Sequence, residues 1–236
     1  MKYTIAATRS FSRTVAGAAC MLAMLAPAHA VTPGVGFVNG SFNGLPSNGS
    51  VPSGWTTLVA SPDTVDTNNN AGSPFYAFPV TPSASPDGGT WVGMATDNLN
   101  NFSERFGQTV SGFTVGVSYT VSWFASNFGF GGAAPFGYTA PGRVEVLVNG
   151  STIGVGSLLA LQPGWVAESL VFTASATMLQ LAFNTALGPR AYLGIDGVGV
   201  APTTAVPEPG GVALMLVGLI TLAMRRLSRL CAAVHR

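Results

Sequence analysis

Residues 118–125 read Ser-Tyr-Thr-Val-Ser-Trp-Phe-Ala, and every second side chain from Tyr119 to Ala125 is apolar. Residues 143–149 and 179–184 repeat this period of two. Successive side chains of a β-strand point to opposite faces of the sheet, so the pattern is typical of strands with one buried face. The three stretches therefore predict half-buried strands.

Turn signals separate these strands at short intervals. Residues 148–151 read Val-Asn-Gly-Ser, which is typical of a tight hairpin, and residues 85–89 and 162–164 contain the Pro and Gly of loops. Because no segment between residues 31 and 206 has a helical period, we predict an all-β fold. The predicted architecture is an antiparallel β-sandwich of the jelly-roll type over residues 31–202, flanked by an N-terminal signal helix and a C-terminal transmembrane helix.

Charged residues are scarce and unevenly distributed. Only 8% of the 236 residues are charged, against roughly 25% in soluble globular domains. Residues 31–206 contain three arginines, eight acidic residues and no lysine, which gives this part a net charge of −5. Binding to nucleic acid requires a basic surface, so this composition argues against a nucleic-acid partner.

The first thirty residues have the features of an export signal. A basic start is followed by an apolar run over residues 15–26 and by the small-residue ending Ala28-His29-Ala30. Twelve apolar residues are too few for a membrane span of about 20. We therefore predict a signal peptide over residues 1–30, cleaved after Ala30.

The C-terminal residues 203–236 have a second ordered pattern. Residues 206–209 read Val-Pro-Glu-Pro, residues 210–224 are mostly apolar, and residues 225–236 form an Arg-rich tail. This order resembles the PEP-CTERM sorting signal of Gram-negative bacteria. The resemblance implies a short membrane helix, cleavage by an exosortase near the motif, and an exported cell-surface or matrix protein. The sorting residues that it implies are Pro207, Glu208, Pro209, Arg225 and Arg226; the alternative is a plain membrane anchor that is not cleaved.

Five stretches of the middle part resemble galactose-binding-like jelly rolls, a group that includes many carbohydrate-binding modules. They are Phe-Val-Asn-Gly-Ser-Phe at 37–42, Pro-Ser-Gly-Trp at 52–55, Gln-Thr-Val at 108–110, Tyr-Thr-Val-Ser-Trp at 119–123 and Gly-Ile-Asp-Gly-Val at 194–198. The resemblance implies that the domain binds a glycan.

Some members of this group contain structural calcium. The matching positions in this sequence are Asn43, where the family usually has a carboxylate, and Asp196. Calcium needs six to eight oxygen ligands, so a hydrogen bond between Asp196 and a neighbouring turn is an open alternative. Ile195 is out of phase with Val198 and Val200, which predicts a bulge near Asp196.

The residue types available to the middle part exclude several kinds of active site. Both histidines, His29 and His235, and both cysteines, Cys20 and Cys231, lie in the segments that we expect to be removed. Without them the domain cannot build a Ser-His-Asp triad, a Cys-His pair or a zinc site with nitrogen and sulfur ligands. We therefore expect no enzymatic activity.

A glycosidase that uses only carboxylates remains as an alternative. It needs two carboxyl groups about 5–9.5 Å apart on either side of the scissile bond. The candidates are Asp63, Asp66, Asp87, Asp97, Glu104, Glu145, Glu168 and Asp196.

Two long predicted loops, residues 61–85 and 128–142, carry aromatic side chains. Sugars present C–H faces and hydroxyl groups, which aromatic rings and a few polar groups can bind. The residues that we predict to bind ligand are Arg143, Glu145, Tyr138, Phe136 and Tyr76. The alternatives are that the first two form a surface ion pair and that the aromatic rings only pack within their loops.

The sequence thus predicts an exported, non-catalytic protein that binds or organises extracellular polysaccharide. A purely structural or adhesive matrix protein is the alternative, because low charge and Gly-rich loops also favour self-association. A discrete binding site would distinguish the first function from the second.

Overall fold

The computed structural model describes residues 34–66, 77–131 and 137–203. All of them belong to the second of two compact units, Met1–Val31 and Thr32–Arg236. The predicted signal peptide, the sorting motif and both predicted flanking helices lie outside the described residues. Within these three ranges, no helix is long and apolar enough to cross a membrane.

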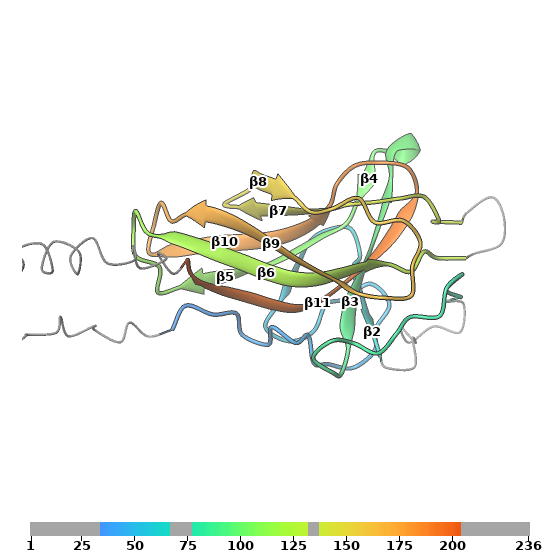
Figure 1. The fold of residues 1–236 in the computed structure, drawn as a ribbon, viewed down its shortest axis with the longest axis horizontal. Coiled ribbons are helices and arrows are strands. Elements are labelled where there is room, and N and C mark those ends of the chain that lie inside the picture. Colours follow the sequence, from blue (N-terminus) through green and yellow to red (C-terminus); the bar gives the residue numbers. More distant parts are fainter. Residues whose placement is uncertain (1–33, 67–76, 132–136, 204–236) are drawn as a thin grey trace, which may run out of the picture. The chain divides into compact units, whose positions relative to one another are not determined.

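Two antiparallel sheets make up the described fold (Figure 1). The five-stranded sheet contains, in spatial order, β1 (Thr56–Val59), β5 (Arg105–Ser111), β10 (Met178–Thr185), β7 (Val144–Val148) and β8 (Ser151–Val155). The six-stranded sheet contains β2 (Asp63–Val65), β3 (Trp91–Asp97), β11 (Ala191–Pro202), β6 (Ser118–Asn127) and β9 (Val166–Thr173), with β4 (Phe102–Ser103) paired to β3. One 3-10 turn, η1 (Asn98–Asn100), follows β3. The predicted antiparallel β-sandwich is confirmed.

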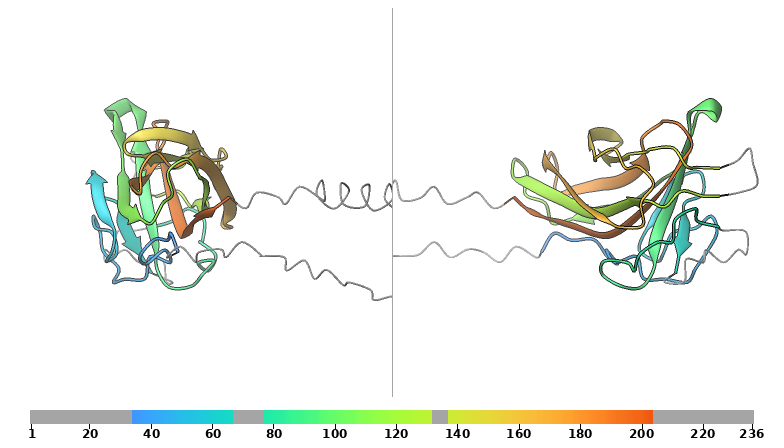
Figure 2. Two further views of the ribbon diagram at one scale, coloured as in Figure 1. Left: turned by 90° about the vertical axis from the view of Figure 1, so that its left-hand side faces the viewer. Right: turned by 45° about the vertical axis from the view of Figure 1, so that its right-hand side comes forward.

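From β5 onward the chain passes repeatedly between the two sheets. It runs from β5 to β6 in the other sheet, back to β7 and β8, then to β9, β10 and β11 in alternating sheets. Figure 2 shows the two sheets as curved layers seen from two further sides. Residues distant in sequence are thereby brought onto the same face.

The strands that the period of two predicted are present. In β6 the side chains of Tyr119, Val121, Trp123 and Ala125 are buried, while those between them face outward or are partly exposed. The predicted hairpin joins β7 to β8, and Asn149 and Gly150 have φ values of 49° and 77°. Two successive positive φ values are typical of a type I′ turn, which fits the twist of the paired strands.

The main core lies between the two sheets and is rich in aromatic rings. Phe183 of β10 is fully buried, and its ring is stacked on that of Phe106 with a centroid distance of 5.7 Å. The same ring meets Trp123 of the other sheet edge-on at 5.9 Å. Aromatic pairs in such arrangements contribute beyond their buried area, so this group links the two sheets.

A second apolar cluster covers one end of the outer face of the six-stranded sheet. Every residue of β3 is buried, with Val92 and Met94 in the main core and Trp91 and Ala95 in this second cluster. Partly buried rings pack on the second cluster. Phe78, Phe130 and Tyr138 come from the two long predicted loops, and Trp165 directly follows the predicted loop at residues 162–164. These loops therefore form a layer over one end of the sheet.

Two details of β2 and β11 bear on the sequence predictions. Residues 61–85 are not loop throughout, because Asp63–Val65 pairs with β3 as β2. The predicted bulge is confirmed: the pairing of β11 with β6 shifts between Asp196 and Gly199, and Gly197 has a φ of 56°. The bulge lets Ile195, Val198 and Val200 all face the main core.

Candidate functional site

A pocket of about 150 Å³ lies where the second cluster meets β2 and β3. Two acidic side chains and several aromatic rings line it, and we call it the carboxylate pocket. Its lining residues are Asn48, Ser61, Asp63, Ala95, Phe102, Glu104, Phe130, Tyr138 and Tyr192. A cavity of about 150 Å³ can hold a molecule of the size of benzene, so this pocket can admit one six-membered ring.

The position of Asp63 in the pocket depends on a glycine in the neighbouring strand. Asp63 of β2 pairs with Gly93 of β3, and a Cβ on Gly93 would overlap the Tyr192 hydroxyl group. The glycine therefore leaves room for the Tyr192 ring, whose hydroxyl donates to Asp63 Oδ2 at 2.8 Å. The backbone N–H of Gly49 donates to Asp63 Oδ1 at 2.8 Å. Asp63 is thus held rigidly, with 4% of its surface exposed.

Glu104 is the second carboxylate of the pocket and is also 4% exposed. The backbone N–H of Ala95 donates to Glu104 Oε2 at 2.7 Å, and Ser61 Oγ donates to Oε1 at 3.3 Å. Burial raises the pKa of Glu104 to about 7, and the negative charge of Asp63 also raises it. The pocket therefore holds two carboxyl groups of which Glu104 is partly protonated near neutral pH.

Tyr138, one of the predicted ligand-binding residues, lines this pocket. Phe130 and Tyr138 exchange two backbone hydrogen bonds, of 3.0 and 2.8 Å, which hold the ends of their loop together. The Phe130 ring lies 6.2 Å from that of Tyr138 and 6.0 Å from that of Tyr192. Outside the pocket, the Arg190 guanidinium lies 5.9 Å from the Tyr138 ring centre and pairs with Asp97 at 2.7 Å.

The structure places Arg143 and Glu145 elsewhere, on the outer face of the five-stranded sheet. Glu145 alternates with the core residues Val144 and Val146, as the period of two predicted. Both of its carboxylate oxygens accept hydrogen bonds, from Thr152 Oγ1 at 2.6 Å and from Asn184 Nδ2 at 2.7 Å.

Arg143 lines a separate hollow of about 160 Å³. Its Nη1 donates to the Gly156 carbonyl oxygen at 3.3 Å. The alternative that Arg143 and Glu145 form a surface ion pair is wrong. Among the described residues the one salt bridge joins Arg190 to Asp97. Tyr76 and Phe136 lie outside the described residues, as do the sorting residues Pro207, Glu208, Pro209, Arg225 and Arg226.

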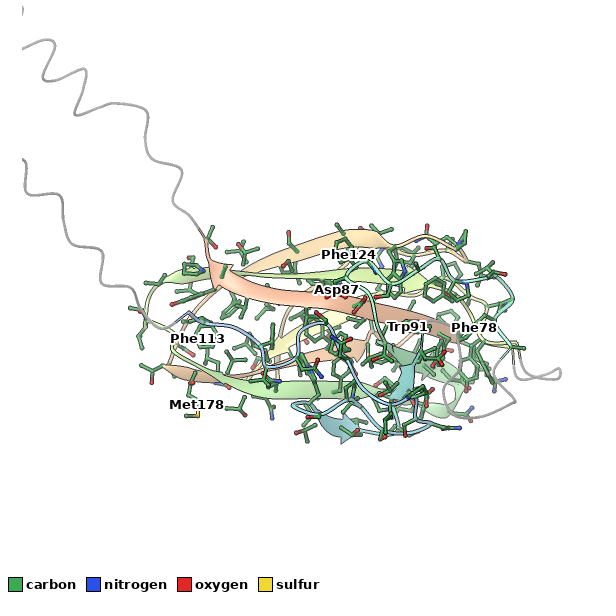
Figure 3. The ribbon with its side chains drawn as sticks, turned by 90° about the horizontal axis from the view of Figure 1, so that it is seen from below. Phe78, Asp87, Trp91, Phe113, Phe124 and Met178 are labelled. Carbon is green, nitrogen blue, oxygen red and sulfur yellow. The ribbon has the colours of Figure 1, made fainter. Side chains whose placement is uncertain are left out.

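Asp196, one of the two predicted calcium ligands, is fully buried in the bulge of β11. Its Oδ2 accepts a hydrogen bond from Ser85 Oγ, and its Oδ1 is buried without a hydrogen-bond partner. Burial raises the pKa of Asp196 to about 8, and the adjacent Asp87 also raises it. Figure 3 shows the Asp87 side chain above β11. A buried carboxylate oxygen without a partner beside a second carboxylate fits a cation site.

The side chain of Asn43, the other predicted ligand, lies beside the C-terminal end of the loop at residues 85–89. Gly89, with a φ of 78°, lies so close to the Asn43 side chain that a Cβ there would overlap its Oδ1. Residues 85–89 therefore contact both Asp196 and Asn43. In the described ranges no cluster of three or more His, Cys, Asp or Glu side chains occurs. Calcium would take its remaining ligands from hydroxyl, amide and backbone carbonyl oxygens, which it accepts readily.

Binding of calcium at Asp196 is expected to raise the midpoint temperature of thermal unfolding. At a concentration about a hundredfold above its Kd, one bound ion adds about 2.7 kcal/mol, or about 5–10 °C for a domain of this size. Scanning calorimetry with and without calcium measures this increase. Asp196→Asn should abolish it and Glu168→Gln should preserve it; an equal increase in all three proteins would contradict the prediction.

Comparison with known proteins assigns the chain to no family. No protein-family model matches the chain, and no curated protein does. Solved structures that resemble it include carbohydrate-binding modules. The xylan-binding CBM22-1 domain of Paenibacillus barcinonensis Xyn10C is 14% identical, with 73% of this chain and 97% of that chain covered and a TM-score of 0.41. The CBM6 of LamC from Zobellia galactanivorans is 13% identical, with 60% and 99% covered and a TM-score of 0.36.

A third structure, the C-terminal domain of the sugar-binding protein EclA, is 20% identical with a TM-score of 0.32. The match covers 40% of this chain and 64% of that chain. At these identities and TM-scores the similarities assign no ligand to this chain. The ligand has to be inferred from the site itself.

Proposed function

We propose that this domain binds carbohydrate, with the carboxylate pocket receiving one sugar residue. The observation that carries the proposal is that the rings of Tyr138 and Tyr192 and the carboxyl groups of Asp63 and Glu104 line one small pocket. Aromatic rings contact the C–H face of a sugar, and carboxylates accept hydrogen bonds from its hydroxyl groups. The size of the pocket favours recognition of a single residue, such as a chain end, over a long internal segment.

Removal of the Tyr138 ring is expected to weaken sugar binding. In Tyr138→Ala the affinity should fall about tenfold, because a stacked aromatic ring contributes roughly 1–1.5 kcal/mol. Tyr138→Phe keeps the ring and is the matched control. A glycan array followed by titration calorimetry on the purified protein, with and without calcium, identifies the sugar and measures both variants. Unchanged affinity in Tyr138→Ala would contradict a role for this pocket.

We also propose that the protein is exported, sorted by its PEP-CTERM-like C-terminus and cleaved by an exosortase. Its place would then be the cell surface or the extracellular matrix of a Gram-negative bacterium, where it would bind or organise exopolysaccharide. The sequence patterns of residues 1–30 and 203–236 support this proposal. Mass spectrometry of the native protein should find an N-terminus at Val31 and a C-terminus near residues 206–209.

Two other functions are alternatives, and each has its own test. A purely structural matrix protein would bind no glycan on the array and would be unaffected by Tyr138→Ala. One observation favours a carboxylate-only glycosidase. Asp63 and Glu104 line the same pocket, and the pKa of Glu104 is raised to about 7. Such enzymes use one protonated and one ionised carboxyl group. Release of reducing sugar that is lost in Glu104→Gln would establish the glycosidase.

A further inference from the structure

Two loops form one end of the sandwich. The first, residues 112–117, joins β5 to β6, and the second, residues 174–177, joins β9 to β10. Three backbone N–H groups of the first loop donate to carbonyl oxygens of the second, at 2.8–3.2 Å. Figure 3 shows Phe113 and Met178 at this end, where β11 also ends. We call the two loops together with Met178 the apolar tip.

The apolar tip exposes three large apolar side chains and carries no charge. Val115 is 58% exposed, Val117 is 37% exposed and Met178 is 59% exposed. Beneath them, the buried ring of Phe113 packs edge-on against Tyr119, with a centroid distance of 4.9 Å, and fixes the first loop on the core. The sequence of both loops and of the strand ends beside them, residues 111–118, 173–178 and 199–203, contains no Asp, Glu, Lys, Arg or His.

The backbone of the first loop is also suited to leaving water. The N–H groups of five of its six residues donate hydrogen bonds within the protein; these residues are Gly112, Phe113, Thr114, Gly116 and Val117. A backbone group without a partner is costly to bring into a bilayer, as is a charged side chain. Contact with lipid would therefore bury the exposed apolar side chains without stranding these donors or any charge.

The described chain ends beside the apolar tip. The N–H of Thr203, the last described residue, donates to the carbonyl oxygen of Ser118 at 2.8 Å, and Ser118 directly follows the first loop. Only residues 204–209 separate Thr203 from the mostly apolar residues 210–224, and six residues span at most about 20 Å.

The short apolar segment brings a bilayer still closer. As a helix, residues 210–224 would be about 22 Å long, which is less than the hydrocarbon thickness of a typical bilayer. A short span is accommodated by thinning of the bilayer or by drawing its flanking residues toward the interface. A bilayer that holds this segment therefore lies within reach of the apolar tip.

We propose that the apolar tip lies on the lipid bilayer that holds residues 210–224, with Val115, Val117 and Met178 in the interfacial region. The contact depends on the membrane segment of the proposed function and not on sugar binding. It also sets the orientation of the domain. Glu104 of the carboxylate pocket directly precedes β5 and the tip directly follows it, so the seven residues of β5 hold the pocket about 24 Å further from the bilayer.

The test is fluorescence of the full chain reconstituted in phosphatidylcholine liposomes. An environment-sensitive label is attached at Val115→Cys, with Cys20 and Cys231 replaced by Ser, and nitroxide groups on the lipid chains act as quenchers. The matched control is a label at Leu99→Cys, because Leu99 is 83% exposed but lies in η1, at the opposite end of the six-stranded sheet. Lipid nitroxides should quench the label at residue 115 at least about twofold more than the label at residue 99.

Charge substitutions give a second readout from a label at Met178→Cys. Val115→Asp should reduce quenching of that label, because an ionised carboxylate resists entry into the bilayer. Leu99→Asp should leave it unchanged. Salt at about 0.5 M should not weaken the quenching, because the tip carries no charge. The label at residue 178 also keeps the proposal testable if Val115→Cys does not fold.

Three results would overturn the proposal. Equal quenching at residues 115 and 99, in a chain that floats with the liposomes, would leave the membrane segment standing without the tip contact. A chain that does not float with liposomes would remove both. A blue shift at residue 115 that grows with the ratio of protein to lipid, without nitroxide quenching, would mean that a second copy of the chain covers the tip. Sugar binding, tested through Tyr138→Ala, is independent of all three results.

Discussion

Replacement of Phe183 by alanine is expected to lower the free energy of unfolding by about 3–5 kcal/mol. Phe183 is fully buried at the centre of β10, and its ring contacts Phe106 in its own sheet and Trp123 in the opposite sheet. Removing the ring leaves a cavity between rigid strands that cannot close around it. Urea denaturation, followed by tryptophan fluorescence, measures the loss.

The matched control is Val171→Ala in β9. Val171 is 56% exposed on the outer face of the six-stranded sheet, so its substitution should change the free energy of unfolding by no more than about 0.5 kcal/mol. If Phe183→Ala were as stable as Val171→Ala, the aromatic group between the sheets would not be the centre of the core.

Glu104→Gln is expected to make the protein more stable above pH 7 and to have little effect near pH 4. The pKa of Glu104 rises from 4.5 to about 7 in the folded protein because of burial and the charge of Asp63. The fold therefore favours the protonated form. Protonated Glu104 makes its full contribution to the free energy of unfolding below pH 4.5. This contribution, about 3 kcal/mol, is lost as the pH rises to about 7. Glutamine remains neutral and does not incur this loss.

Urea denaturation of the parent protein and of Glu104→Gln between pH 4 and 9 tests this expectation. The difference at pH 4, where both side chains are neutral, measures any effect of the amide on packing. The amide can keep both hydrogen bonds, with its oxygen at the Ala95 N–H and its nitrogen at Ser61 Oγ. A difference that stays constant across this range would mean that Glu104 does not titrate in the fold near pH 7.

The alternation of apolar and polar side chains predicted the strands with one buried face. It missed β3, a strand with both faces buried. β6 shows a clear period because the side chains between Tyr119 and Ala125 alternate between core and outer face. β3 lies between the main core and the second cluster, so all seven of its residues are buried and no alternation remains in the sequence. β2 has only three residues, which is too short for a periodic signal.

The binding residues were only partly predictable, for a related reason. Tyr138 stood out as a loop aromatic, and it lines the carboxylate pocket. Asp63 and Glu104 were two of eight candidate carboxylates, and their proximity depends on the pairing of β2, β3 and β4. Asp63 and Tyr192 are 129 positions apart in the chain and become neighbours only because β2 and β11 both pair with β3. No local pattern in the sequence predicts such a pairing.

The position of β11 also determines when the domain can fold. This last strand of the described chain is central in its sheet, because it pairs with β3 on one side and with β6 on the other. Until residues 191–202 have left the ribosome, the two halves of the six-stranded sheet have no strand to join them. Folding of the sandwich is therefore expected to finish only after almost all of the domain has been synthesised. A nascent chain that stays unfolded until that moment remains able to pass through a translocation channel.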